Sequence, residues 1–313
     1  MRSFAEVEEA IREYPVKDLA VAVAQDHTVL DAVSEATRRN IIRPILVGDE
    51  LAIKATAEQH KLDISGATLV HERDPIKAAA AATAIVSRGE ADILMKGHIH
   101  TDDFLRAVLD KEKGLRTGSI MSHVYLIEDP KREHFLFMSD GAMNIAPDLA
   151  VKAAIILNAV HVAKAFGLEE PRVAVLAAVE LVNPAMPATV DAGTLHIMWH
   201  RGQFSPKCVV EGPFAFDNAI SEWAAQHKKI GGAVAGKADV LIVPDIEAGN
   251  MMAKSFTYMA GLTVAGLVVG ARAPIVLTSR ADKADAKLAS IMCAVYMHSV
   301  VRELRLKVGK VHY

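Results

Sequence analysis

Short apolar segments alternate with helical segments along almost the whole chain, and this alternation restricts the possible folds more than any other feature. The apolar segments are β-branched and continuous, as parallel strands covered on both faces should be. The expected strands are Leu19–Ala24, Pro44–Val47, Thr68–His71, Asp92–Lys96, His123–Ile127, Phe135–Ser139, Arg172–Ala178, Cys208–Glu211, Val240–Pro244, Gly266–Val269 and Pro274–Thr278. The expected helices are His27–Arg39, Glu50–His60, Pro75–Arg88, Asp102–Asp110, Leu149–Phe166, Thr189–Arg201, Asn218–Gln226, Ala248–Met259 and Lys283–Leu304. This order predicts doubly wound α/β layers.

The length of the chain predicts more than one domain. Its 313 residues exceed what one core of ordinary size supports and fit about two domains. The stretch between His123–Ile127 and Phe135–Ser139 has no helical pattern, so we expect these two strands to pair antiparallel. A long helix then starts a second domain. We predict a first α/β domain of residues 1–147 and 283–313, a second of residues 148–282, and a cleft between them.

Composition excludes several classes of protein. The net charge of −3 gives no global basic field for nucleic acid. The two cysteines, Cys208 and Cys293, have neither disulfide nor metal-site spacing, which indicates a reducing, cytoplasmic setting. The acidic, amphipathic N-terminus does not have the pattern of a signal peptide. The most apolar stretch, Met259–Leu277, contains Arg272 and Pro274, so it predicts two buried strands and no membrane span.

The apolar run before Thr278 ends abruptly in Ser279 and Arg280, and a helical pattern starts at about Asp282. A hydroxyl, a guanidinium and a carboxylate therefore lie at the mouth of a strand-to-helix turn, which is where open α/β sheets bind ligands. A helix N-terminus adds free N–H groups that suit phosphate. This arrangement predicts chemistry on an anionic substrate.

The roles of the hydroxyl and the carboxylates follow from their surroundings in the sequence. Ser279 could be a nucleophile or an oxyanion donor; because it lies in no Gly-x-Ser-x-Gly elbow and has no nearby histidine, the donor role is favoured. Asp282 fits a helix N-cap. Asp285, one turn further, can act as a base or complement the helix dipole.

A second candidate segment follows another expected strand and precedes a helix. Lys96 and the backbone around Gly97 can hold a phosphate, and Thr101 fits a helix N-cap. His98 and His100 would share one face of a strand. We expect no metal site, because no cysteine or acidic residue stands at a matching distance.

Two arginines belong to the same part of the sequence. Arg106 lies one turn into the helix that follows, as an anion ligand or as a solvated charge. Arg116 stands beside hydroxyl residues and glycine in a turn before a strand, where a guanidinium can bind phosphate through two hydrogen bonds. A plain surface turn fits the same spacing.

Further polar residues follow expected strands in the second half of the chain. One glycine turn is flanked by Ser139, Asp140 and Asn144. These side chains either line a cleft or only stabilise the turn. Asp245 and Asn250 flank another strand end, where helix capping explains one of the two.

Five segments in fixed order resemble one known family, that of phosphate acetyltransferase and phosphate butyryltransferase, and most of all its butyryltransferase-type branch. The resemblance implies a fold shared with isocitrate and isopropylmalate dehydrogenases. It also implies the reaction of acyl-CoA and phosphate to acyl phosphate and CoA, with CoA as a substrate, no bound cofactor or metal, and a homodimer or larger assembly. The segments are Met95–Thr101, Ser139–Pro147, Glu211–Ser221, Val243–Asn250 and Leu277–Asp282.

The resemblance also implies roles for individual residues. A Ser-Arg pair that serves catalysis and substrate binding matches Ser279 and Arg280. The family's proposed base falls on Ala286 by strict spacing, so Asp285 or Asp282 must take that role. The residues expected to contact phosphate or CoA are Arg106, Arg116, Lys96, Thr101, Ser139, Asp140, Asn144, Asp245 and Asn250.

Three other functions remain open from the sequence. An NAD-dependent decarboxylating dehydrogenase on the same fold would need an acidic metal-binding cluster, which the sequence does not present convincingly. A non-catalytic acyl-CoA-sensing module would bind without turnover. An acyltransferase that takes long acyl chains from a carrier protein would act on carrier-bound groups.

Overall fold

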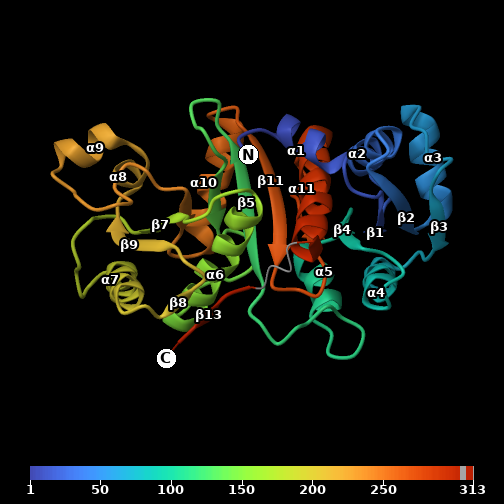
Figure 1. The fold of residues 1–313 in the computed structure, drawn as a ribbon. Helices are drawn as coiled ribbons and strands as arrows, with labels where there is room; N and C mark the ends of the chain where they lie inside the picture. Colours follow the sequence, from blue (N-terminus) through green and yellow to red (C-terminus); the bar gives the residue numbers. More distant parts are fainter. Residues whose placement is uncertain (304–307, 313) are drawn as a thin grey trace. The chain divides into compact units, whose positions relative to one another are not determined.

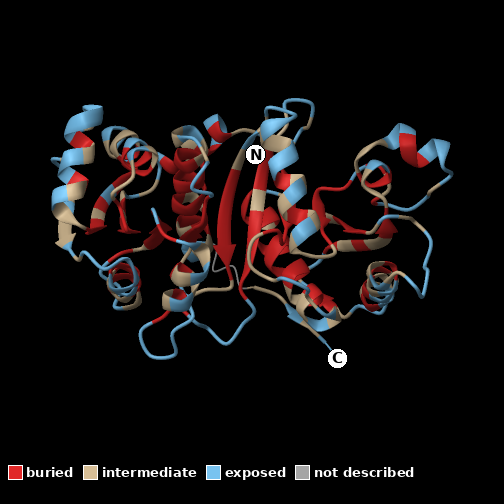
Figure 2. Cartoon of the chain, turned by 180° about the vertical axis from the view of Figure 1, so that it is seen from behind, coloured by how far each residue is buried: buried red, intermediate tan, exposed pale blue. Residues whose placement is uncertain are grey.

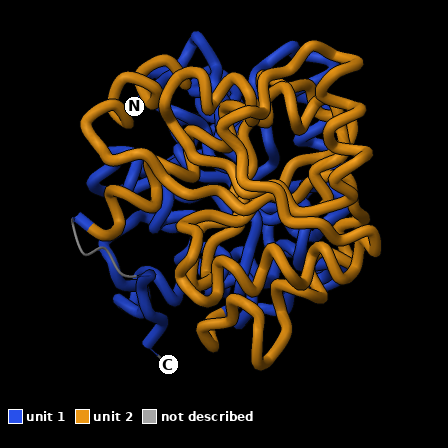
Figure 3. The backbone as a smooth tube through the Cα atoms, turned by 90° about the vertical axis from the view of Figure 1, so that its right-hand side faces the viewer, with its two compact units in different colours: residues 1–3, 120–264, 303–313 blue, residues 4–119, 265–302 orange. Residues whose placement is uncertain are grey.

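The computed structural model describes residues 1–303 and 308–312 and has the predicted α/β class. The chain divides into two compact units, which Figure 3 distinguishes by colour. Unit 1 comprises residues 1–3, 120–264 and 303–313, and unit 2 comprises residues 4–119 and 265–302.

Unit 2 is built around six strands in the order β3-β2-β1-β4-β12-β11. The chain moves from β1 to β2 to β3 and then returns, so right-handed crossovers put the returning helix on the opposite face of the sheet. Figure 1 shows this, with α2 on one face and α4 on the other. The elements are α1 Phe4–Ile11, β1 Lys17–Ala22, α2 His27–Arg38, β2 Ile42–Gly48, α3 Glu50–His60, β3 Thr68–His71, α4 Pro75–Ser87, β4 Ile93–Lys96, α5 Thr101–Val108, β11 Thr263–Val269, β12 Ile275–Val276 and α11 Ala284–Glu303.

Within its described residues, unit 1 contains five strands in the order β5-β6-β10-β7-β9 and a separate pair of β13 with β8. The long helix α6 is buried around nearly its whole circumference, as the apolar sequence on all its faces requires. The elements are β5 Ser122–Glu128, β6 Leu136–Ser139, α6 Leu149–Ala165, β7 Arg172–Leu176, α7 Pro187–His200, β8 Phe204–Ser205, β9 Val209–Phe214, α8 Phe216–Ile220, α9 Glu222–His227, β10 Val240–Ile242, α10 Ile246–Tyr258 and β13 Lys310–Val311.

Strand direction confirms one expectation and corrects another. β5 and β6 pair antiparallel, as predicted from the missing helix between them. β11 and β12 were expected among parallel strands, but they also pair antiparallel, with Leu267 opposite Val276. The reason is that the short connection after Val269 is a turn, whereas parallel neighbours need a long crossover.

These two antiparallel pairs also explain where the units divide. β6 pairs with β10, which puts the β5–β6 pair in unit 1. β12 pairs with β4, which brings residues 265–282 into unit 2. The division therefore falls at 119/120 and 264/265, whereas the sequence analysis placed it at 147 and 282.

The helices follow the predicted ranges closely, with three differences. α1 has no counterpart among the expected helices. The segment expected as one helix over Asn218–Gln226 is two short helices, because Ser221 is extended and caps the second through a hydrogen bond from Ala224 N. The last expected helix ended at Leu304, which lies outside the described residues; α11 is described to Glu303.

The core of each unit lies on its strands and on the helix faces that cover them, as the burial colours in Figure 2 show. Within the described residues, none of the helices combines the length and the apolar character that crossing a membrane would need.

Candidate functional site

The chain reverses direction across the unit 2 sheet between β1 and β4. The strands that follow β1 lead to one edge of the sheet, while β4 pairs on the other side of β1, with Lys96 opposite Ala22. β12 then pairs with β4, with Val276 opposite Met95. Because ligands bind outside the carboxyl ends of strands at such a reversal, the residues that follow these three strands form the candidate site.

The segment after β4 lies against the segment after β1. Gly97 N donates to Ala22 O at 2.8 Å, and His98 N donates to Val23 O at 2.8 Å. A Cβ atom on Gly97 would lie 2.2 Å from Val23 O and 2.5 Å from Ala22 O, so a side chain at this position would push the two segments apart. Position 97 therefore needs glycine for close backbone contact.

Asp26 links these two segments through its carboxylate. It caps α2 by accepting from Val29 N at 3.0 Å and from Thr28 Oγ1 at 2.6 Å, and its Oδ2 lies 3.2 Å from His98 Nδ1. Burial acts to raise the pKa of Asp26, but these hydrogen bonds and the charges of Lys287 and His98 lower it below its ordinary value. The carboxylate is therefore ionised at neutral pH.

The loop after β12 forms a closed turn over Ser279–Asp282. Ser279 N donates to Asp282 Oδ2 at 2.7 Å, Asp282 N donates to Ser279 O at 3.1 Å, and Ala281 N donates to Ser279 Oγ at 3.4 Å. Asp282 thus closes the turn, and the expected N-cap role is wrong, because α11 begins two residues later. Thr278 Oγ1 is buried and has no hydrogen-bond partner among the described residues.

Lys287 supports this turn through hydrogen bonds to its backbone, a role that was not predicted from the sequence. Its side chain is 2% exposed, and Nζ donates to Ser279 O at 3.2 Å and to Asp282 O at 2.5 Å. Burial lowers the pKa of Lys287, opposed by the charges of Asp282 and Asp26. The available signal was a lysine at the start of an apolar helical stretch, Leu288–Val295, where burial of a charge requires partners.

Lys96 ends β4 as a second buried ammonium. It is 3% exposed, and its Nζ donates to Gly97 O at 3.4 Å. Burial, together with the positive charges of Arg280 and Lys287, lowers the pKa of Lys96 to about 8, while Asp282 and Asp26 act in the opposite direction. Lys96 was expected at an anion-binding site. The structure places it in a cluster of three cations and two carboxylates of unit 2, which are Lys96, Arg280, Lys287, Asp26 and Asp282.

The other arginines expected at the site reach into solvent. Arg280 is exposed at the tip of the turn. The Arg106 side chain is 77% exposed and pairs with Asp103 at 3.1 Å on α5. Arg116 is exposed in the loop after α5, where neighbouring Thr117 Oγ1 donates to Gly270 O at 2.7 Å. These three guanidiniums can turn toward a ligand with little loss of packing.

Two further candidates of unit 2 lie at helix starts. Thr101 is the first residue of α5 and not its N-cap; His100 takes that position, and its side chain makes no capping hydrogen bond within the described residues. Asp285 lies in the first turn of α11 with an exposed side chain, where it complements the helix dipole.

The candidates in residues 139–144 of unit 1 lie in a loop whose polar groups are hydrogen-bonded to one another and to neighbouring backbone. Ser139 is fully buried, and its Oγ donates to His123 O at 2.8 Å. The buried Asp140 carboxylate accepts from His123 N at 3.2 Å, from Ala142 N at 2.9 Å and from Asn144 Nδ2 at 2.6 Å. The structure brings these residues together, and their hydrogen-bonding groups are used within the loop and by His123 of β5.

Asp245 and Asn250 belong to α10 in the same unit. Asp245 caps the helix by accepting from Ala248 N at 2.8 Å, while Asn250 Nδ2 donates to Gly141 O at 3.2 Å. A Cβ atom on Gly141 would lie 2.6 Å from the carbonyl carbon of Gly249, so the loop and the helix are in close backbone contact. Asn250 thus holds the loop against α10, whereas the Asp245 carboxylate serves the start of the helix.

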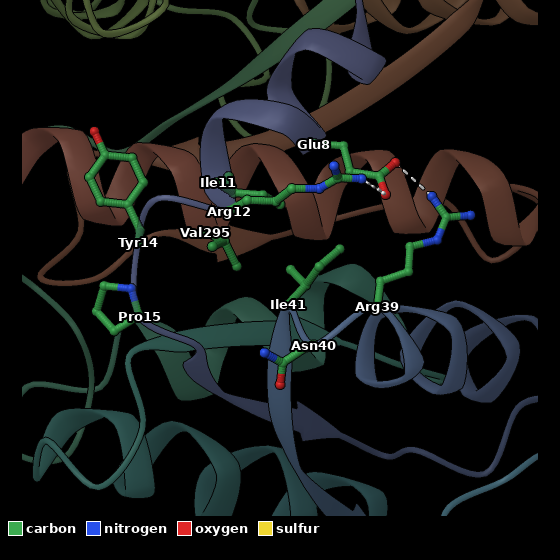
Figure 4. A pocket seen from close by; sticks show the side chains of 9 residues that line it. All are labelled: Glu8, Ile11, Arg12, Tyr14, Pro15, Arg39, Asn40, Ile41 and Val295. Atoms are coloured by element: carbon green, nitrogen blue, oxygen red, sulfur yellow. Dashed lines mark hydrogen bonds and ion pairs between the residues drawn. The ribbon is translucent and has the colours of Figure 1, made fainter.

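A cavity of about 330 Å³ in unit 2 is lined by residues outside the Ser279–Asp282 turn, and Figure 4 shows their side chains. Its two arginines already face carboxylates: Arg12 lies 2.8 Å from Glu9, and Arg39 lies 2.7 Å from Glu8. The cavity therefore offers little uncompensated charge to an anion. The lining residues are Glu8, Ile11, Arg12, Tyr14, Pro15, Arg39, Asn40, Ile41 and Val295.

Metal ligands do not gather at the site. Within residues 1–303 and 308–312, no group of three or more His, Cys, Asp or Glu side chains could hold a metal ion. His98, considered with His100 as a metal-ligand pair, instead faces Asp26.

Comparison with known proteins identifies the family. The family model of phosphate acetyl/butaryl transferase matches residues 4–78 and 72–295. A phosphate butyryltransferase of Clostridium beijerinckii is 49% identical over 293 residues, which cover 94% of this chain and 97% of that protein. The crystal structure of a branched-chain phosphotransacylase from Enterococcus faecalis V583 superposes with a TM-score of 0.80 at 33% identity, covering 90% of this chain and 99% of that one.

A more distant structure shares the fold alone. A putative 4-hydroxythreonine-4-phosphate dehydrogenase from Salmonella typhimurium gives a TM-score of 0.54 at 13% identity, over 90% of this chain and 99% of that one. The predicted α/β fold class is confirmed, and this fold is shared with the dehydrogenase structure. The resemblance found in the sequence is also confirmed, and the chain belongs to the phosphate acetyl/butaryl transferase family.

Proposed function

We propose that the protein is a phosphate acyltransferase that interconverts a short-chain acyl-CoA and inorganic phosphate with the acyl phosphate and CoA. The observation that carries this proposal is the exposed Ser279–Arg280 pair on a closed turn, beside two buried ammonium groups at the chain reversal of unit 2. The family and the Clostridium beijerinckii butyryltransferase support this activity and favour butyryl over acetyl as the acyl group.

The reaction needs a thiolate and a place for the negative charge that develops on the acyl group. A thiol with a pKa near 8.5 is mostly protonated at neutral pH, so CoA must lose a proton before it attacks the acyl carbonyl. Holding CoA and acyl phosphate together supplies proximity without a covalent enzyme intermediate. In our proposal CoA is a substrate, and the protein needs no resident cofactor.

Ser279 is suited to the role of oxyanion donor. Its N–H is already bound to Asp282, and its Oγ accepts from Ala281 N, which leaves the hydroxyl hydrogen to donate. Arg280 is adjacent and exposed, so it can neutralise the phosphate as the acyl group leaves. Arg106 and Arg116 complete the proposed anion-binding groups.

The acyl pocket is expected to discriminate modestly. Each buried methylene contributes about 0.8 kcal/mol, or roughly a fourfold difference in rate between neighbouring chain lengths. We therefore expect overlapping activity on acetyl and butyryl groups.

A panel of acyl-CoA substrates from acetyl to octanoyl tests the proposal through phosphate-dependent release of free thiol. We expect the highest kcat/KM among the short chains. Binding of acyl-CoA without thiol release would favour a sensing module, NADH formation from a hydroxy acid would favour a dehydrogenase, and activity restricted to carrier-bound acyl groups would favour a carrier-dependent acyltransferase. Light scattering on the same preparation tests the proposed homodimer or larger assembly.

A further inference from the structure

The proposed reaction lacks an obvious proton acceptor. Strict family spacing puts Ala286 where a carboxylate would stand. The Asp282 carboxylate accepts the Ser279 N–H at 2.7 Å and so holds the turn closed. Asp285 is exposed on the first turn of α11, where water screens it. Neither aspartate is a buried group with free capacity for a proton.

The two buried lysines differ in how well their ammonium groups are satisfied. Lys287 Nζ has two carbonyl partners, at 3.2 Å and 2.5 Å, which stabilise its charged form. An ammonium offers three donors, yet among the described residues Lys96 Nζ makes one long hydrogen bond of 3.4 Å, to the next residue. Loss of a proton therefore costs less at Lys96 than at Lys287.

We propose that Lys96, as a neutral amine at the end of β4, accepts the thiol proton of CoA and passes it to the departing phosphate. This inference rests on the proposed function and names the group that serves as its base. It places the proton acceptor on a strand of the sheet, in the segment whose backbone contacts Val23 and Ala22.

In the direction that consumes acyl phosphate, proton transfer and attack on the acyl carbon come first, and departure of phosphate follows. The S–H bond breaks, its proton forms an N–H bond on Lys96, and the sulfur lone pair attacks the acyl carbon, whose oxygen takes up the carbonyl electron pair and accepts from Ser279. Collapse restores the carbonyl and breaks the carbon–oxygen bond to phosphate. Phosphate leaves with that electron pair and takes the proton from the Lys96 ammonium.

The charges that face Lys96 support this role. Arg280 and Asp282 come from the loop after β12, Lys287 from α11 and Asp26 from the start of α2. Burial and the two cations outweigh the two carboxylates and bring the pKa of Lys96 to about 8. An ordinary thiol has a pKa near 8.5, so proton transfer between the two is nearly balanced, as efficient general-base catalysis requires.

Lys96→Arg separates a proton acceptor from a binding cation. The guanidinium keeps the positive charge but is not deprotonated in proteins. If Lys96 is the base, kcat falls by about 10²–10⁴-fold while the KM for acyl phosphate stays near that of the wild type. Wild-type kcat in folded Lys96→Arg, with an unchanged pH profile, overturns the inference.

A second variant covers the case in which arginine does not fit. Lys96→Cys treated with bromoethylamine gains an amine that is a weaker base than lysine; wild-type protein treated in the same way controls for alkylation of Cys208 and Cys293, which are as buried as position 96. We expect activity to return after treatment, with the rise of kcat displaced to lower pH. Recovery with the rise at the wild-type pH, or no recovery in a folded and fully alkylated protein, contradicts a proton-accepting role.

Lys17→Met and Lys17→Arg are the matched controls. Lys17 is 8% exposed at the opposite, amino end of the neighbouring strand β1. These variants report what the loss of a buried lysine does to folding, and they should keep the wild-type pH profile. Failure of the proposed function is distinct, because wild-type protein would then release no thiol in a phosphate-dependent manner.

Discussion

Two loops of this protein begin with a serine at the end of a strand, yet they use their polar groups in opposite ways. In unit 1, Ser139 and Asp140 are buried, and their hydrogen bonds go to the same loop, including the Asn144 side chain, and to the backbone of β5. In unit 2, Ser279 and Arg280 are exposed, while the groups that hold their turn lie beneath them in Lys287 and in Asp282. A polar residue after a strand is available for chemistry when another residue supports its backbone.

The largest effect should come from Arg280→Ala, which removes the exposed charge and leaves the turn. We expect phosphate-dependent cleavage of acyl-CoA to fall by more than about 10³-fold, because the charge of the departing phosphate loses its nearest proposed partner. Thermal unfolding should be unchanged, since the side chain is solvent-exposed. Near wild-type turnover in the folded variant would refute the proposed role of the turn.

A matched pair of serine substitutions compares the two loops directly. Ser279→Ala should lower kcat by about 10²–10³-fold with little change in stability, as the loss of one oxyanion donor does. Ser139→Ala should leave kcat unchanged and lower the free energy of unfolding by about 1–3 kcal/mol, because His123 O loses a buried donor. Steady-state kinetics and denaturant unfolding of both variants would show the reverse pattern if the two roles were exchanged.

Lys287→Met tests whether the buried ammonium positions the turn. Two carbonyls lose their donor, so we expect the free energy of unfolding to fall by about 1–3 kcal/mol. A displaced Ser279 should also lower kcat by up to about 10²-fold. The control is Lys152→Met in α6, where the buried lysine pairs with Asp191 at 2.6 Å. This variant should lower the free energy of unfolding and leave kcat unchanged. Equal kcat values for both variants would assign Lys287 to stability alone.

The smallest effect is expected at Arg106. Arg106→Ala removes an exposed pair with Asp103, so unfolding should change by less than about 1 kcal/mol. The KM for phosphate should rise by about fivefold, which corresponds to one screened charge of roughly 1 kcal/mol. Arg12→Ala removes a similar exposed pair, with Glu9 at 2.8 Å, and should leave KM unchanged. A KM unaffected by either substitution would make Arg106 a solvated charge.

Most strands and helices could be predicted from the sequence because the residues at their ends mark where each element starts and stops. The ranges expected for β3 and α3 match the structure residue for residue. β4 and β6 also end at the predicted residues, Lys96 and Ser139, since polar residues after an apolar run end a strand wherever the strand lies in the sheet. Site roles stay predictions, because they depend on substrates.

What the sequence could not provide were pairings between distant segments. The position of β12 beside β4 decides the division of the units, and no local pattern encodes it. Lys287 was missed for a related reason: its partners are backbone carbonyls of the preceding turn, which any sequence would supply. The capping roles assigned to Thr101 and Asp282 failed because each helix begins at a different residue from the one its sequence suggests.

β12 has two residues, and this shortness has a consequence for how the protein could change over evolution. The sheet fixes where the Ser279 turn starts, but two paired residues exert little control over its tilt. That tilt depends on one side chain from α11 and one from the turn itself. Substitutions along α11 are therefore expected to change the direction of the turn, and with it the proposed Ser279 and Arg280 groups, while every strand of the sheet stays in register.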